Sequence, residues 1–360
     1  MIKMGAKLQL FSDNTEKWWL FFAIYSKIIV YLCTEKVKKK QNLILSMKLT
    51  GRRESSNVED RRGLSGGAKA AAGGGILAVI IGVVMSLLGG GGSGGGGGID
   101  LGQIIGAVTQ GGGLGDILGG GKTEAVDPSQ FSEEEQELAK ECKQILASTE
   151  DVWTKVFKDY NLPNSMTGQN GTYTTPTLVL FTNSVQSACG SATASVGPFY
   201  CSGDQKLYID LSFFTEMKRQ LGVEGNTFAY AYVIAHEIGH HVEFLTGSLT
   251  KAHQDMSRVN KTQANQISVR LELLADYYAG VWAHYEEAMN HSMEYGDLEK
   301  GLELAHAIGD DWLQKQAQGR AVEESFTHGT SEQRKRWLKK GFQTGDMRTS
   351  TFQITNYRDL

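Results

Sequence analysis

The spacing of hydrophobic and polar residues predicts both helices and strands in the C-terminal two thirds of the chain. Ser132 precedes three glutamates and a long run with helical periodicity, which predicts a helix over 133–160. The stretches "TPTLVLFT" (175–182) and "KLYIDLSFF" (206–214) are rich in β-branched and aromatic residues and predict strands. Helical patterns follow, the first over about 226–245. We therefore predict an α+β fold that is mainly helical and contains a small sheet.

An uncharged apolar stretch, residues 73–92, precedes this region. Its strongly apolar core, Ile76 to Leu88, has thirteen residues. A spanning helix needs roughly 17–25 residues, so the flanking glycines would have to lie inside the bilayer as well. We expect a single uncleaved membrane anchor, because glycine tracts on both sides do not suit the alternative, a buried core helix. The Lys/Arg excess in the basic segment 47–72 predicts a cytoplasmic N-terminus and a C-terminal domain on the extracytoplasmic side.

Differences in composition divide the remainder of the chain into four further segments. Residues 1–46 contain an aromatic and apolar run interrupted by Lys27, which is a first membrane segment or an upstream extension of the reading frame. We favour the extension, with translation starting at Met47, because this run matches nothing in the organisation that follows. The Gly-rich residues 93–128 predict a flexible linker. The expected organisation ends with a folded domain and a C-terminal tail, residues 129–345 and 346–360.

Charge and cysteine usage narrow the possible partners. The net charge of −4 gives no case for a nucleic-acid partner. Four cysteines show no metal-knuckle spacing. Cys189 and Cys201 are twelve residues apart, and they form either a disulfide in an oxidising compartment or two buried free thiols. The sequence leaves these two alternatives open.

The stretch "AHEIGHHVE" combines histidines and glutamates within an otherwise apolar predicted helix. His236 and His240 are four residues apart, so their rings lie on one helix face and can reach one tetrahedral Zn²⁺. Glu237 points beside this metal, where it can take a proton from the activated water and pass it to a leaving amine. The alternative is a core helix with internally bonded histidines, but each polar group would then need a buried partner.

A catalytic zinc site requires a third protein ligand. A third histidine six residues after His240 is excluded, because that position is Thr246. The helix predicted over 263–289 instead offers Glu272 and, one turn later, Asp276. Glu272 would complete a His–His–Glu site, and Asp276 would accept the free N–H of a ligand histidine. The alternative of a solvated helix face is disfavoured by the apolar residues that flank the pair, and small residues on both helices would permit close approach.

The order of several residue blocks carries a resemblance to a known family. The blocks are "MKLTGRRESSNVEDRRG", "VGPFYC", "KLYIDLSFF", "AHEIGHHVE", "RLELLADYYAGVWA", "GDDWLQKQAQGR" and "SFTHGTSEQRKRW". Together they resemble the bacterial neutral zinc metallopeptidase family over residues 47 to about 345. More distantly, the chain resembles the membrane-associated gluzincins, which combine an HExxH helix with a downstream ExxAD helix. The resemblance implies a zincin-like fold.

The resemblance also implies roles for individual residues. It implies Zn²⁺ on His236, His240 and Glu272, with Glu237 as general base. It places Met47 at the usual start of the family. The chain departs from the gluzincin pattern at Gly329, where those proteins have proline, and in having Cys142; neither position is an expected ligand.

Further roles and alternatives remain at this point. His328 precedes a predicted helix and would donate a hydrogen bond to a developing oxyanion, or it ties a loop to the core. "KLYIDLSFF" is either an edge strand on which a peptide pairs or a core strand. We expect a membrane-anchored zinc metallopeptidase that acts on peptides or proteins. The rivals are an inactive zinc-fold module that binds peptides or cell-envelope partners, and a zinc hydrolase that acts on another amide.

Overall fold

The computed structural model describes residues 46–63, 128–223 and 225–360, and Met47–Leu360 form one compact unit. The expected anchor at 73–92, most of the expected linker and nearly all of residues 1–46 lie outside the described residues. No helix within the described part is long and apolar enough to cross a membrane. The description below concerns the folded unit alone.

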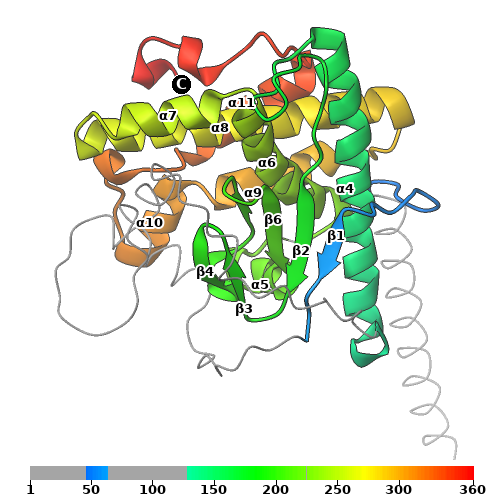
Figure 1. The fold of residues 1–360 in the computed structure, drawn as a ribbon. Coiled ribbons are helices and arrows are strands. Elements are labelled where there is room, and N and C mark those ends of the chain that lie inside the picture. The colour runs from blue at the N-terminus through cyan, green and yellow to red at the C-terminus, as the bar shows by residue number, and fades with distance from the viewer. Residues whose placement is uncertain (1–45, 64–127, 224) are drawn as a thin grey trace, which may run out of the picture. The chain divides into compact units, whose positions relative to one another are not determined.

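The main sheet has four strands in the order β1-β2-β6-β5. The first three strands are parallel, whereas β5 is antiparallel to β6 and forms one edge. A separate antiparallel hairpin, β3–β4, stands beside this edge (Figure 1). The strands are β1 (Val58–Asp60), β2 (Thr177–Phe181), β3 (Ser184–Ser187), β4 (Gly190–Thr193), β5 (Phe199–Cys201) and β6 (Lys206–Asp210).

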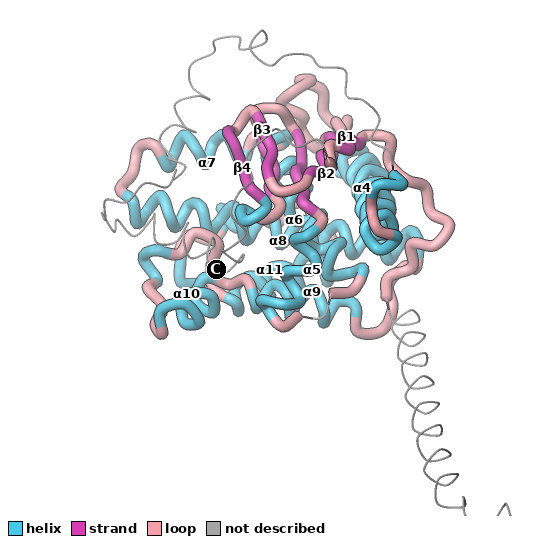
Figure 2. The backbone as a smooth tube through the Cα atoms, turned by 90° about the horizontal axis from the view of Figure 1, so that it is seen from below, coloured by secondary structure: helices cyan, strands magenta, loops and turns pink. Residues whose placement is uncertain are grey.

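Helices make up most of the remaining structure, and the strands gather at one side of them (Figure 2). Side-chain caps fix several helix starts: Asn226 begins α6, Asn260 begins α8 and Thr330 begins α11. The prediction of a mainly helical α+β fold is confirmed. The α-helices are α4 (Glu133–Tyr160), α5 (Ser212–Leu221), α6 (Thr227–Leu245), α7 (Ser248–Met256), α8 (Lys261–Asn290), α9 (Asp297–Ala307), α10 (Asp310–Gln318) and α11 (Ser331–Thr344).

The stretch predicted as one strand over 206–214 is divided in the structure. Strand β6 ends at Asp210, whose carboxylate accepts hydrogen bonds from the backbone N–H groups of Ser212 and Asn183. This carboxylate satisfies the first free donor of α5, so the chain turns into a helix. Because β6 lies between β2 and β5, the hypothesis that it is an edge strand is wrong.

Close helix packing follows from small residues, as the sequence indicated. A Cβ atom on Gly239 of α6 would lie 2.9 Å from the backbone of Ala275 on α8, so these two helices approach as closely as glycine permits. Gly280 does not share in this contact; it packs against the backbone of α11 around Gly341. Helix α8 is therefore held between α6 and α11, with side chains such as Trp282 fully buried.

The folded unit extends beyond the expected boundaries at both ends. Residues 47–63 do not form a segment separate from the domain, because β1 pairs with β2 and Met47 and Leu49 are buried. The C-terminal residues are not a free tail, because Arg270 donates to the carbonyls of Thr351 and Ile354. Polar segments with few apolar residues gave no sign of this, since their partners lie far away in the sequence.

Cys189 and Cys201 form a disulfide, which decides between the two alternatives that the sequence left open. This bond ties the turn of the β3–β4 hairpin to the edge strand β5. Cys142 is a buried free thiol in α4. The hairpin and the edge strand are thus held together next to helix α6, which contacts β5.

Candidate metal centre

The metal site expected from the sequence is brought together where α6 and α8 cross. His236, His240 and Glu272 each direct one ligand atom to a common point, and these atoms lie within 4.8 Å of one another. The Nε2 atom of His236 is 3.2 Å from one carboxylate oxygen of Glu272, and the Nε2 atom of His240 is 3.5 Å from the other. The two histidines come from successive turns of α6, and the glutamate comes from the helix packed across them.

These distances fit a zinc ion. With zinc–ligand bonds of 2.0–2.2 Å, neighbouring atoms of a tetrahedral site lie about 3.3–3.6 Å apart. The two nitrogen–oxygen distances, 3.2 and 3.5 Å, are close to this edge length, although they involve different oxygens of Glu272. Three protein ligands also leave one tetrahedral position for water or substrate, as in catalytic rather than structural zinc sites. The donor set, two imidazoles and one carboxylate, is one that zinc prefers.

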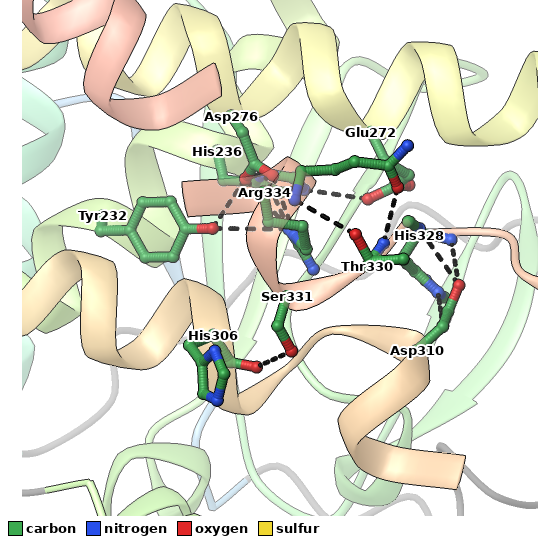
Figure 3. A network of polar contacts seen from close by, with 12 residues as sticks. Tyr232, His236, Glu272, Asp276, His306, Asp310, His328, Thr330, Ser331 and Arg334 are labelled. Carbon is green, nitrogen blue, oxygen red and sulfur yellow. Dashed lines mark hydrogen bonds and ion pairs between the residues drawn. The ribbon is translucent and has the colours of Figure 1, made fainter. Parts of the chain in front are cut away.

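Asp276 holds His236 in one tautomer (Figure 3). Its Oδ1 atom lies 2.8 Å from Nδ1 of His236 and accepts a hydrogen bond of 2.6 Å from the hydroxyl of Tyr232. An ionised carboxylate only accepts, so Nδ1 of His236 carries a proton and Nε2 is the ring atom that can bind a metal. Arg334 on α11 donates to both oxygens of Asp276, at 2.8 and 3.0 Å. Burial alone would raise the pKa of Asp276, but Arg334 and His236 lower it to about 2.

Glu243 performs the same task for His240, which the sequence interpretation missed. It lies one turn after His240 on α6 and is wholly buried, and its Oε2 atom is 2.9 Å from Nδ1 of His240. The i, i+3 spacing was the available signal, because such residues are neighbours on a helix. Both ligand histidines are therefore backed by a carboxylate.

Glu237 lies half-buried on α6 beside the two histidines. Burial raises the pKa of Glu237 above its ordinary value, against the lowering effect of the neighbouring histidines. The backbone of Tyr200 on the edge strand β5 also bonds to it. The general base expected from the motif thus stands between the ligand helix and the sheet edge.

His328 is held by Asp310, the first residue of α10. Oδ2 of Asp310 accepts the backbone N–H groups of Thr327, His328 and Gly329, while Oδ1 lies 3.1 Å from Nδ1 of His328. Burial would lower the pKa of His328, but the carboxylates of Asp310 and Glu272 raise it to about 9. The half-buried ring is thereby positioned as a hydrogen-bond donor on the Glu272 side of the site (Figure 3).

The site attracts positive charge. Burial lowers the pKa of His240, yet the carboxylates of Glu243 and Glu272 outweigh this effect and raise it to about 10. Burial raises the pKa of Glu272, but His328, His240 and His236 hold it below its usual range. The carboxylates that favour a proton on these rings equally favour a metal cation.

Other histidines downstream of the motif do not join the cluster. His284 bonds to the carbonyl of Phe342, and the grouped ligand atoms in the described part of the chain do not include His253, His291 or His306. His241 points away from the site, where it contacts the hydroxyl of Tyr200 and the carbonyl of Thr174. Of the three histidines in the motif, two therefore face Glu272.

Comparisons with known proteins point to one family. A family model described as "Putative neutral zinc metallopeptidase" matches residues 47–352. "Uncharacterized protein YpfJ" of Escherichia coli is 42% identical over 300 residues, covering 83% of this chain and 96% of that protein. "Uncharacterized protein Rv2575" of Mycobacterium tuberculosis is 42% identical over 183 residues, 48% of this chain and 61% of that protein. No solved structure gives a significant match. The chain belongs to the neutral zinc metallopeptidase family.

Proposed function

We propose that this protein hydrolyses peptide bonds with Zn²⁺ bound by His236, His240 and Glu272. The observation that carries the proposal is the convergence of these three ligand atoms beside Glu237. A site that only stabilised the fold would take four protein ligands and would have no use for a neighbouring base. Three ligands with an adjacent carboxylate suit hydrolysis instead.

Zinc, when bound, supplies a Lewis acid that polarises a carbonyl and makes water acidic enough to be deprotonated near neutral pH. Glu237 then accepts the proton of the attacking water and delivers it to the leaving amine nitrogen. Its raised pKa suits both steps, because a general acid–base group works best when its pKa is close to the working pH. Asp276 and Glu243 keep the two histidine rings in place throughout.

His328 is proposed to stabilise the oxyanion that develops as the carbonyl is attacked. Asp310 fixes Nδ1 of His328, which leaves the other ring nitrogen available to donate. A positioned donor of this kind contributes more in the transition state than in the substrate complex. The alternative role, tying the loop to the core, is already filled by the three backbone hydrogen bonds to Asp310.

A peptide substrate is supported by the edge strand rather than by β6. Strand β5 is an edge of the sheet in the described structure, and the backbone of its middle residue, Tyr200, bonds to Glu237. An extended peptide that paired with β5 would run directly past the proposed base. The Cys189–Cys201 disulfide holds this strand to the β3–β4 hairpin. Main-chain pairing would favour peptides over other amides.

We also propose that the domain works outside the cytoplasm. The disulfide supports this placement, because such bonds persist in oxidising compartments. Contact with a membrane through residues 73–92 is proposed from their apolar composition alone.

The experiment is cleavage of a peptide library by zinc-loaded protein, with and without a chelator. The matched control is Glu237→Gln, which preserves size and hydrogen bonding but cannot accept the proton. We expect the variant to retain one zinc per chain and to lose cleavage. A wild type that binds zinc and cleaves no peptide would refute the proposal and favour a binding module or a hydrolase of another amide.

A further inference from the structure

We propose that residues 47–63 lie on the same side of any membrane as the peptidase domain. The chain would then leave the domain after Gly63 and return to it at Pro128, so that residues 64–127 do not carry it across a bilayer once. This differs from the single crossing, with a cytoplasmic N-terminus and an extracytoplasmic domain, that the charge pattern predicts. The evidence is the way in which the described N-terminal residues pack.

Strand β1 is part of the central sheet. Val58, Glu59 and Asp60 pair in parallel register with Leu178, Val179 and Leu180 of β2. The backbone hydrogen bonds extend on either side, from Leu178 to the carbonyl of Asn57 and from Arg61 to the carbonyl of Leu180. Without this segment, β2 would expose a row of unpaired backbone groups along its outer side.

The residues before β1 complete buried charges of the domain. Arg52 forms an ion pair with Glu286 of α8, a carboxylate that is wholly buried and also accepts from Ser148 of α4. If Arg52 were across a membrane, Glu286 would remain a buried charge without a basic partner. Such a charge is strongly destabilising. The pair is therefore expected only if both residues share a compartment.

A second buried carboxylate depends on the same segment. Glu150 of α4 accepts hydrogen bonds from Arg53, at 2.9 Å, from the hydroxyl of Ser55, at 2.6 Å, and from the side-chain amide of Asn57, at 2.7 Å. Ser55 and Glu150 are both buried. The polar residues of "GRRESSN" thus form buried contacts with the domain, whereas a basic cytoplasmic segment beside a membrane anchor would need only exposed charges.

The described residues just before position 64 and just after position 127 also lie together. The guanidinium of Arg62 is bonded to Asp60, at 2.6 Å, and stacks 4.2 Å above the ring of Phe131. The Cα of Gly63 is close enough to this ring that a Cβ atom there would lie 3.6 Å from it. Arg62 and Gly63 are thus neighbours of Phe131 in the folded unit.

The test uses the full chain in the membranes of bacterial cells and a membrane-impermeant maleimide. Single cysteines are introduced at two exposed positions, Ser56→Cys before β1 and Thr250→Cys on α7, and the parent chain without an added cysteine gives the background. We expect both positions to be labelled to the same extent in intact cells, and again alike after permeabilisation. Labelling of one position in intact cells and of the other only after permeabilisation would overturn the proposal.

A second measurement tests the docking of this segment without the introduced cysteines, in case these prevent folding. Arg52→Ala, Glu286→Ala and the double variant are compared by thermal unfolding of the purified chain. If the segment docks as described, the double variant loses less stability than the sum of the single variants. Fully additive losses would contradict the docking, whatever the labelling result. Glu54→Cys, also exposed, replaces Ser56→Cys if the latter protein does not accumulate.

Discussion

Glu243→Leu should weaken zinc binding without removing a ligand. The substitution takes away the acceptor 2.9 Å from Nδ1 of His240, so the ring loses both its fixed tautomer and its orientation. Glu243 is wholly buried, and its second oxygen has no hydrogen-bond partner in the described structure, so the contact to His240 is its main polar interaction there. Loss of such a partner typically reduces metal affinity by about 10–100-fold. This corresponds to about 1.4–2.7 kcal/mol of binding free energy.

The assay is competition for zinc with a chromophoric chelator, read as the dissociation constant of the zinc complex. Glu243→Gln is the matched control, because its amide oxygen still accepts from His240 and should keep most of the affinity. Thermal unfolding of the metal-free proteins shows separately whether the leucine variant is folded. A folded Glu243→Leu protein that binds zinc within about twofold of the wild type would refute a positioning role.

Three further predictions concern the ligand, the helix crossing and the oxyanion. Glu272→Ala should abolish stoichiometric zinc, measured by metal analysis after dialysis, and full zinc retention would show that the third ligand lies elsewhere. Gly239→Ala places a Cβ 2.9 Å from the backbone of Ala275, so urea unfolding should show a loss of about 1–3 kcal/mol; an unchanged midpoint would mean that the helices have room to separate. His328→Ala should lower kcat by about 10²–10³-fold while zinc content stays the same, as for other oxyanion donors; an unaltered kcat would leave His328 a structural residue.

Local sequence signals were enough for helices α4, α6 and α8 and for the grouping of His236, His240 and Glu272. The bounds of α4 follow from Ser132 and the acidic first turn, and those of α6 follow from its cap at Asn226. The spacing of four between His236 and His240 fixes their common face whatever the tertiary structure. Glu272 required one further step, the inference that two helices with small residues cross there. The packing of Gly239 on Ala275 agrees with that inference.

Residues recruited from distant segments could not be predicted in this way. Arg334 contacts Asp276 from helix α11, which begins at Ser331, 55 residues after Asp276. Nothing in the sequence around Arg334 distinguishes it from a surface arginine. Strand β1 has three residues, two of them acidic, and therefore lacks the apolar alternation by which strands are recognised. Its pairing is determined by β2 and by ion pairs with helices α4 and α8.

The charges of the site give an argument for a dication that does not depend on ligand spacing. Arg334 neutralises Asp276, and Asp310 is paired with His328. This leaves Glu237, Glu243 and Glu272, with which no lysine or arginine of the described chain forms an ion pair.

Three carboxylates in one poorly solvated place repel one another unless positive charge is supplied. A divalent cation on the two histidines and Glu272 removes most of this repulsion. The raised pKa of Glu237 allows this carboxylate to take up a proton, which removes its own negative charge. Without a metal, the compensating positive charge comes from protons on the histidines, and Glu243 and Glu272 accordingly raise the pKa of His240 to about 10. Charge and spacing thus support the proposed metal site by separate routes.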